Sequence, residues 1–468
     1  MLDLTNIQGN ILRGYASFPY AKFLFLKIDD SAEARRFVRG LVDDDWVTPA
    51  QWREKPHATL NIGISFDGLR SLGLPEVSLA TFPAEFQEGM RHRARALGDV
   101  RDSSPENWDP PWRELRVHIL LMMYGQTVDA LDEHCEKLRS FLLPGVRELG
   151  PEQSAGRLCI EDHLTLKEHF GFRDGLSNPA IQGVADDPAN RREDIGNPDG
   201  DGGFRKIPLG EFVLGHRGEG GETAPMPLPH SLSNDATYLV FRKLEQDVPA
   251  FRNYIAEQAP AFASTFRNGL PHAISAEELL AAKIMGRWPN GSSLVDYPYE
   301  PARLPAERSP GNAFAYTQDP AGARCPLGAH VRRANPRDSL GFGGKTVSRH
   351  RLIRRGIPYG KYLPPGEQDN GKRGIIFIAF NSGLDQFEFV QQNWINYGDD
   401  FEQSNDSDPV AGSREGGQMV IPGDQATRRR PFVCFDIPRF VTTRGGDYFF
   451  VPSLSGLKVL ASGPIEVS

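Results

Sequence analysis

Short runs of apolar residues along the chain predict strands. Residues 23–28 form a nearly continuous apolar run of strand length, which is typical of a strand buried on both faces. From Leu60 to Phe66 every second residue is apolar, and the same alternation runs from Leu115 to Met123. Because successive side chains of a strand point to opposite faces, this period of two predicts two half-buried strands.

Helical spacing follows two of these strands. Asp30 stands three residues before Glu33, an arrangement that is typical of a helix start, and the helix is expected to continue to about Val42. After Thr127 the apolar residues recur at steps of three and four as far as Leu142. This spacing predicts a helix with one apolar face, beginning with Val128.

The later part of the chain repeats this alternation without a clear sequence repeat. It predicts strands at residues 212–214, 237–242, 375–380 and 448–451. It predicts helices at residues 249–259, from Ser275 onward and at residues 385–395. Strands interleaved with helices in this way indicate an α+β fold in which helices cover antiparallel sheets.

The segment from residue 178 to residue 235 is dense in Gly, Pro, Asp and Asn. It is too long to be a simple connection between two elements. The expected organisation is therefore an N-terminal domain at 1–177, a connecting segment at 178–235 and a C-terminal domain at 236–468.

Composition narrows the function classes. The chain has 53 basic and 61 acidic residues and a formal net charge of −8, which argues against a nucleic-acid partner. It contains no apolar run long enough for a membrane span. Its first residues lack the basic and apolar regions of a secretory leader, which predicts a cytoplasmic protein, although export with an omitted leader stays open. The four cysteines show neither a CxxC pair nor zinc-ligand spacing.

The segment CPLGAHVRRANPR, residues 325–337, concentrates candidate chemistry. His330 stands in a turn framed by Gly and Pro and is followed by Arg332, Arg333 and Arg337. A neutral imidazole is a common metal ligand and an axial ligand of haem iron. Arginines beside it can bind the carboxylates of a haem through paired N–H donors. Upstream, the segment GFRDG places Asp174 between two glycines.

Four segments in this order resemble the signature of the dye-decolourising peroxidases, a family of haem peroxidases. They are GFRDG at 171–175, CPLGAHVRRANPR at 325–337, RRGIPYG at 354–360 and GIIF at 374–377. The resemblance implies two ferredoxin-like domains with antiparallel sheets and peripheral helices. It also implies one haem b, with its pocket mainly in the C-terminal domain. Ile375 stands where many members of the family carry leucine.

The resemblance implies a role for three polar side chains. His330 would be the proximal ligand of the iron. Asp174 would be the distal acid–base group, which removes a proton from the peroxide and returns it to the leaving oxygen. Arg354 would stabilise the charge that develops there; Arg355 is the neighbouring choice, but the residues that follow favour Arg354. A carboxylate base stays ionised where a histidine would be protonated, which predicts activity at acidic pH.

Further residues are implied with less detail. Ile375 and Phe377 have the same parity on one expected strand, so both can form an apolar wall of the pocket. Arg332 and Arg337 are the expected partners of the haem propionates. The second nitrogen of His330 needs an acceptor, and the sequence leaves open whether this is Asp385 or Glu388.

The sequence allows two roles for each of three further histidines and one tryptophan. His163, His169 and His216 either line the haem or serve the fold only. Trp394 is either a core residue or a relay that carries electrons from a bulky dye at the surface. The sequence alone favours the structural interpretation of all four.

The function implied is a peroxidase that cleaves hydrogen peroxide and oxidises dyes, phenols and similar aromatic donors by one-electron steps through a ferryl intermediate. The alternative is a haem-handling or iron-release protein with incidental peroxidase activity, which would need the ligand His330 but not the pair Asp174 and Arg354. The natural reductant, the oligomeric state and the physiological role are not determined by the sequence.

Overall fold

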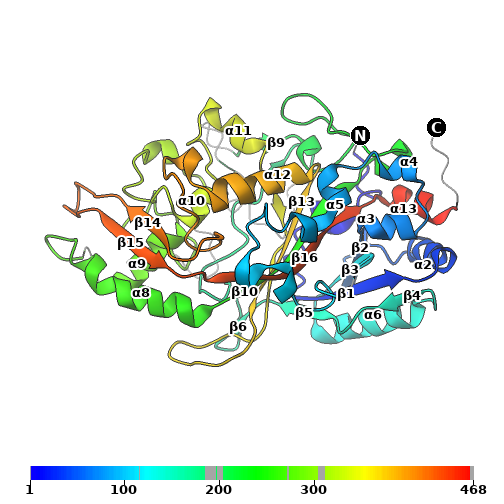
Figure 1. Cartoon of the computed structure of the whole chain (residues 1–468), viewed down its shortest axis with the longest axis horizontal. Coiled ribbons are helices and arrows are strands. Elements are labelled where there is room, and N and C mark those ends of the chain that lie inside the picture. The colour runs from blue at the N-terminus through cyan, green and yellow to red at the C-terminus, as the bar shows by residue number, and fades with distance from the viewer. Residues whose placement is uncertain are drawn as a thin grey trace.

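A single antiparallel sheet runs through both halves of the chain (Figure 1). The computed structural model describes residues 2–114, 116–184, 197, 204–270, 274–303 and 311–463. Within these residues the main sheet has ten strands, eight of them in the order β11-β13-β10-β16-β2-β3-β1-β4, with β12 paired to β13 and β5 paired to β1.

The N-terminal half has the element order of a ferredoxin-like unit. Its elements are β1 (Tyr20–Ile28), α2 (Ser31–Asp43), β2 (Ala58–Ile64), β3 (Ile119–Gly125), α6 (Val128–Phe141) and β4 (Val146–Glu148), with β5 (Gln153–Gly156) following. In space the four strands lie in the order β4-β1-β3-β2. A β-α-β-β-α-β chain with this strand order is the ferredoxin-like arrangement.

The C-terminal half repeats the arrangement. Its elements are β10 (Thr237–Gln246), α8 (Val248–Ala263), α9 (Ala276–Met285), β11 (Ile353–Arg354), β12 (Ile357–Tyr359), β13 (Gly374–Asn381), α12 (Leu384–Phe389) and β16 (Val441–Val451). Here the strand order is β16-β10-β13-β11. The expectation of two ferredoxin-like units in an α+β fold is therefore confirmed.

Shorter elements surround these two units. They are α1 (Gly9–Leu12), α3 (Phe66–Ser71), α4 (Glu76–Leu79), α5 (Ala84–Arg93), α7 (His230–Ser233), α10 (His330–Ala334), α11 (Lys345–Ser348), α13 (Leu454–Ala461), and the strand pairs β6 (Cys159–Ile160) with β7 (His163–Leu164), β8 (Ala180–Ile181) with β9 (Lys206–Ile207), and β14 (Gly417–Ile421) with β15 (Phe432–Ile437).

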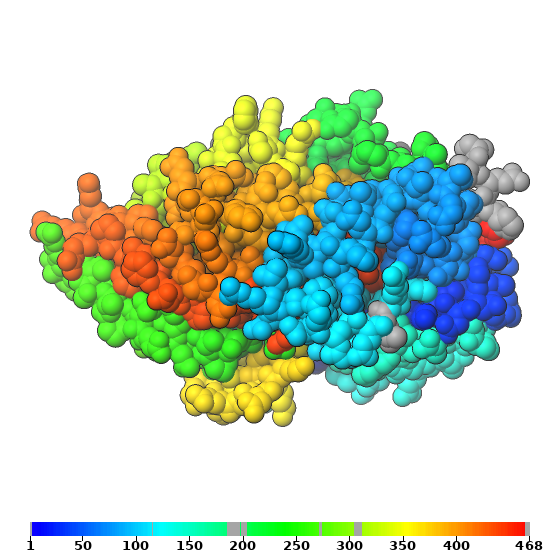
Figure 2. Space-filling view, in the orientation of Figure 1, coloured from blue at the N-terminus to red at the C-terminus, as the bar shows by residue number. Residues whose placement is uncertain are grey.

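The largest hydrophobic cluster of the described residues contains side chains from both halves. Phe450 of β16 pairs with Ile64 of β2, which joins the two units edge to edge. The ring of Phe241 on β10 lies 5.5 Å from that of Phe23 and 5.8 Å from that of Phe25, both on β1. In the space-filling view the blue and cyan half meets the orange half along a broad border (Figure 2). The domain boundaries at residues 177 and 235 stay a prediction.

The predicted helix starts agree with the structure. The Asp30 side chain accepts a hydrogen bond of 2.8 Å from the Glu33 amide at the start of α2, and Thr127 caps α6 in the same way. Ser275 caps α9. The apolar face of α6 begins later than predicted, because Val128 is exposed while the residues one and two turns further on are buried.

Two strands predicted to be half-buried are buried on both faces. In β2 the polar Asn61 is fully buried, because the N-terminal segment covers this face: Tyr15 Oη donates to Asn61 Oδ1 at 2.9 Å. All residues of β3 are buried, and this strand begins only at Ile119, while Leu115 lies outside the described residues. Phe66, expected at the end of a strand, begins α3 instead.

Two further predictions need correction. Residues 212–214 form no strand; they follow a short 3-10 turn at Leu209–Glu211 and are buried as a turn against β10. The helix predicted at residues 385–395 is α12 followed by a π-helical segment, Val390–Asn396. Part of the predicted connecting segment, residues 185–196 and 198–203, lies outside the described residues.

In the part of the chain that the structure describes, no helix has both the length and the apolar composition needed to cross a membrane.

Candidate active site

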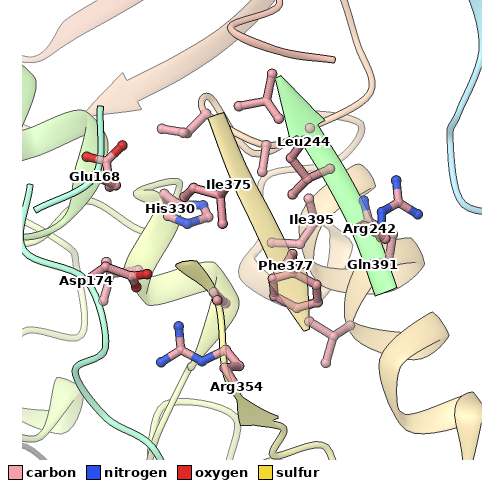
Figure 3. Close-up of a pocket in the computed structure, with 18 of the residues that line it drawn as sticks. Glu168, Asp174, Arg242, Leu244, His330, Arg354, Ile375, Phe377, Gln391 and Ile395 are labelled. Carbon is pink, nitrogen blue, oxygen red and sulfur yellow. The ribbon is translucent and has the colours of Figure 1, made fainter. Parts of the chain in front are cut away.

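A cavity of about 300 Å³ opens beside the C-terminal unit. Its walls come from β10, β13, α10, the loop that carries Asp174 and the segment around residue 410. Five of the predicted site residues lie on this lining, as Figure 3 shows: Asp174, His330, Arg354, Ile375 and Phe377. The fold therefore brings together residues that are separated by up to 203 positions in the sequence (377 − 174).

His330 is oriented by a carboxylate that the sequence analysis did not identify. Its Nδ1 lies 2.9 Å from Oδ2 of Asp408. The other oxygen of Asp408 accepts hydrogen bonds from the amides of Val410 at 2.8 Å and Ala411 at 2.7 Å. With the proton held on Nδ1, the second nitrogen of the imidazole is free to act as a ligand.

The half-buried imidazole of His330 lies beside the fully buried carboxylate of Asp408, and each group shifts the pKa of the other. Burial alone would lower the pKa of His330, but the adjacent Asp408 carboxylate outweighs it and raises that pKa. Burial would raise the pKa of Asp408, but the imidazole, Arg333 and a backbone amide keep it below its usual value. The carboxylate therefore stays ionised beside the ring and favours a proton on Nδ1.

Asp174 and Arg354 are positioned by the same loop. Both neighbouring glycines of the GFRDG segment have positive φ, 97° at Gly171 and 79° at Gly175, a conformation that other residues adopt only with strain. The carboxylate of Asp174 is half-buried at the cavity. Arg354 donates from its guanidinium to the carbonyl of Leu176 at 2.6 Å, two residues after Asp174. This contact holds the two side chains on the same side of the cavity (Figure 3).

Ile375 and Phe377 form an apolar wall. They alternate along β13 with buried residues that face the core, and both reach the cavity. Leu244 of β10 lies opposite Ile375 in the sheet register and extends the same wall. The shared parity predicted from the sequence therefore corresponds to a shared face in the structure.

Glu168 is a second carboxyl group at the cavity that the sequence analysis missed. It accepts hydrogen bonds of 2.9 Å from the amides of Phe170 and Phe172 and one of 2.6 Å from the side chain of Gln246. Burial raises its pKa to about 7, an effect that these hydrogen bonds only partly offset. Its position six residues before Asp174, next to the glycine-framed segment, was the available signal.

Arg332 and Arg337 are not among the residues that line the cavity, and their propionate role stays a prediction. Both are almost fully buried. Arg332 donates to the carbonyls of Asp319 and Cys325, and Arg337 donates to those of Asn312 and Phe314. Their N–H groups therefore bind backbone carbonyls of the surrounding chain.

Arg351 is a buried arginine that lines the cavity, as Arg242 and Arg287 also do. Its guanidinium donates to the carbonyl of Ser177, and among the described residues no carboxylate lies within ion-pair distance of it. Burial lowers its pKa to about 9. A cationic side chain that is buried without a counter-ion is suited to an anionic group inside the cavity.

Neither Asp385 nor Glu388 is the partner of His330. Asp385 is exposed at the start of α12. Glu388 is buried but accepts from Arg93 at 2.6 Å and from Tyr448 Oη at 2.7 Å. Asp408 was not predictable from spacing, because nothing in the sequence distinguishes it from the other acidic residues.

Three other histidines lie where the favoured structural interpretation placed them, and His350 differs. His163 is exposed, His169 is buried against the carbonyl of Tyr359 at 2.8 Å, and His216 pairs with Asp235 at 2.8 Å; none of the three lines the cavity. His350 does line it, and its ring stacks on that of Phe389 at 3.9 Å.

Trp394 is buried, and its indole N–H donates to Asp400 at 2.8 Å. Its ring lies 5.5 Å from that of His350, which contacts the cavity. An aromatic path thus leads from the cavity toward the surface loop of Asp400, and the relay role of Trp394 stays a prediction.

Comparison with known proteins places these features in a family. Residues 6–157 match the model of the DyP dimeric alpha+beta barrel domain. Dye-decolorizing peroxidase msp1 of Mycetinis scorodonius is 30% identical over 98% of this chain and 88% of its own length. Multifunctional dye peroxidase DyP2 of Amycolatopsis sp. is 30% identical over 98% of this chain and 96% of its own length.

Solved structures agree over the whole chain. A dye-decolorizing peroxidase in complex with 2,6-dimethoxyphenol superposes with a TM-score of 0.80 at 26% identity, covering 99% of this chain and 100% of that one. An ancestral D-type dye decolorizing peroxidase gives a TM-score of 0.81 at 27% identity, with the same coverage. The chain therefore belongs to the dye-decolourising peroxidase family and is an oxidoreductase that acts on peroxide.

Proposed function

We propose that the protein is a haem b peroxidase in which His330 binds the iron, Asp174 moves the peroxide proton and Arg354 stabilises the developing charge. The observation that carries this proposal is the hydrogen bond of 2.9 Å between His330 Nδ1 and Asp408, in a cavity that Asp174 and Arg354 also line. This is the arrangement that a proximal ligand requires: one nitrogen tied to an acceptor and the other available to a metal.

The residues present fit a haem. Among the described residues no three His, Cys, Asp or Glu side chains gather as they would around a bare metal ion, so His330 is suited to a metal whose other ligands are not protein side chains. The buried guanidinium of Arg351 has no carboxylate partner in the described chain and would hold a propionate in place of the predicted Arg332 and Arg337. The walls formed by Ile375, Phe377 and Leu244 suit an apolar macrocycle.

Different side chains have different roles in the cleavage of hydrogen peroxide. When bound, haem supplies the iron that takes up the two oxidising equivalents of the peroxide. The carboxylate of Asp174 would accept a proton from one oxygen of the peroxide and deliver it to the other oxygen, which leaves as water. The guanidinium of Arg354 stays cationic and stabilises the negative charge on the departing oxygen. Ile375 and Phe377 exclude water, which strengthens both interactions.

Aromatic donors then reduce the oxidised enzyme, and each donor molecule supplies one electron. The related peroxidase solved with 2,6-dimethoxyphenol supports a phenolic donor for this chain as well. The overall reaction balances as two ArOH and one H₂O₂ giving two ArO• and two H₂O. Each phenol loses one electron and one proton, and the peroxide accepts both pairs.

The test is the substitution Asp174→Asn in haem-reconstituted protein. We expect haem to remain bound, with an unchanged Soret band, and turnover of peroxide with a phenol to fall by about 10²- to 10⁴-fold, because a positioned acid–base group contributes that much. Asp385→Asn, at an exposed position, is the matched control and should keep full turnover. Undiminished turnover in Asp174→Asn would contradict the assignment. Loss of haem from His330→Ala, measured by the same spectrum, tests the ligand separately.

A further inference from the structure

A second cavity adjoins the candidate active site and shares its polar wall. It has a volume of about 370 Å³. Arg173, Asp174, Arg354 and Gly356 line both this cavity and the one that contains His330. Much of the remaining wall comes from the N-terminal half, including Tyr15 and the other residues Asn10, Phe18, Tyr124 and Arg157, and Arg355, Ile357 and Pro358 complete it. A molecule in the second cavity would therefore contact the outer side of Asp174 and Arg354.

The second cavity is strongly cationic. Five basic side chains line it, against the single carboxylate of Asp174: Arg157, Lys167, Arg173, Arg354 and Arg355. Among the described residues, no carboxylate lies within ion-pair distance of Arg157, Lys167 or Arg354. Hydrogen peroxide is neutral and needs no such charge, so the lining is suited to an anion.

Two side chains that line the second cavity each carry a buried polar atom without a hydrogen bond in the described part of the chain. Asn10 is 1% exposed and Tyr124 is 5% exposed. Asn10 Oδ1 and Tyr124 Oη form no hydrogen bond within the described residues, although both side chains line the cavity. Buried polar atoms are rarely left unsatisfied, so each marks a place where a ligand atom or water completes the network. The hydroxyl can donate to, and the amide oxygen can accept from, a polar ligand.

Aromatic rings supply the apolar part of the wall. The ring of Tyr15 lies 5.4 Å from that of Phe18 and 5.2 Å from that of Tyr124, both in edge contact. Such a cluster offers ring faces and edges to a flat ligand. Aromatic surface, the cationic side chains of Arg157, Lys167 and Arg354, and two buried polar atoms without a hydrogen bond in the described chain thus occur together on one lining.

We propose that the second cavity binds aromatic carboxylates, so that phenols bearing a carboxylate are the preferred donors of this enzyme. The inference rests on the proposed function. The carboxylate lies among the side chains of Arg157 and Lys167, and the ring packs beside Tyr15. The phenol end then faces Asp174 and Arg354. Oxidation follows the balanced reaction given above, with one electron and one proton leaving each phenol.

The test compares 4-hydroxybenzoate with its uncharged analogue 4-hydroxybenzamide. Equilibrium binding to the haem-reconstituted protein, measured by calorimetry, should be about tenfold tighter for the anion, as one charge-assisted contact provides. Raising the salt concentration should weaken binding of the anion and leave the amide unchanged. Equal affinity for the two compounds at low salt would overturn the proposal.

Two substitutions locate the site. Arg157→Gln and Lys167→Gln should each weaken binding of 4-hydroxybenzoate and raise its KM by about three- to tenfold, with kcat and the constants for the amide unchanged. Lys137→Gln is the matched control, because this exposed lysine on α6 pairs with Glu133 far from either cavity. Arg157 also donates to the carbonyl of Ala16, so Lys167→Gln keeps the test valid if Arg157→Gln fails to fold.

The two proposals fail in different ways. If 4-hydroxybenzoate binds selectively but the protein never turns over peroxide, the peroxidase mechanism is wrong and the anion site stands. If turnover is normal but Lys167→Gln leaves the affinity and KM of the anion unchanged, the anion site is wrong and the peroxidase mechanism stands.

Discussion

At the scale of single residues, Asp408 decides which nitrogen of His330 is available to a metal. Its carboxylate is fully buried, holds Nδ1 at 2.9 Å and is itself held by two backbone amides. An imidazole fixed in this way presents one tautomer and one ring orientation. A metal at the other nitrogen then gains a more basic ligand.

The substitution Asp408→Asn tests this role. An amide cannot supply the negative charge that favours the Nδ1 proton, so we expect the affinity for haem to fall by about 10- to 100-fold. Titration of the haem-free protein, followed by the Soret band, measures the effect. Asp385→Asn should leave the affinity unchanged. An unaltered affinity in Asp408→Asn would show that His330 does not depend on this carboxylate.

At the scale of elements, the loop from Glu168 to Asp174 is shaped by its own first residue. The two oxygens of Glu168 accept from the amides of Phe170 and Phe172, and Gln246 of β10 ties the same carboxyl group to the sheet. Asp174 ends this loop, and its amide donates to Leu166 at 2.8 Å. The direction in which Asp174 points therefore depends on a neighbouring buried group.

Glu168 should also make stability depend on pH. Its pKa is about 7 in the folded protein against 4.5 for the free side chain, so between these values the folded state holds a proton that the unfolded state has released. The free energy of unfolding should therefore fall by up to about 3 kcal/mol as the pH rises from 4.5 to 7.

Urea unfolding of Glu168→Gln at pH 4.5 and pH 7 measures this contribution. The variant should lack the decrease, while Glu136→Gln, at an exposed helical position, should retain it. If wild type and Glu168→Gln lose the same stability over this range, Glu168 does not carry the buried proton.

At the scale of the whole molecule, a buried ion pair joins the two halves beside the cavity. Arg242 of β10 donates to Asp99 at 2.6 Å, and Thr443 of β16 donates to the same oxygen at 2.6 Å. Both charged side chains are about 5% exposed. The pair therefore links a loop of the N-terminal half to the sheet of the C-terminal half.

Removing Asp99 should destabilise the whole molecule. We expect Asp99→Ala to lower the free energy of unfolding by about 3–5 kcal/mol, because Arg242 would keep its charge in a buried place without a counter-ion. The control Glu133→Ala removes an exposed pair and should cost at most about 1 kcal/mol. A loss below 1 kcal/mol in Asp99→Ala would mean that water or another group satisfies Arg242.

Local sequence rules predicted where helices begin better than they predicted which residues are buried. The caps at Asp30, Thr127 and Ser275 depend on residues three positions apart, and all three agree with the structure. The burial of Asn61 and the turn at residues 212–214 depend on contacts with distant segments, and the alternation of residues missed both.

The sequence by itself predicted an α+β fold from capping and periodicity, because both are properties of neighbours along the chain. The resemblance of four short segments to a known family implied the two ferredoxin-like units and the five residues that line the cavity. Only the tertiary structure decided that Asp408 holds His330 and that Arg351, and not Arg332 or Arg337, reaches the cavity. These features depend on contacts between residues that are distant in the chain, and composition and spacing do not predict such contacts.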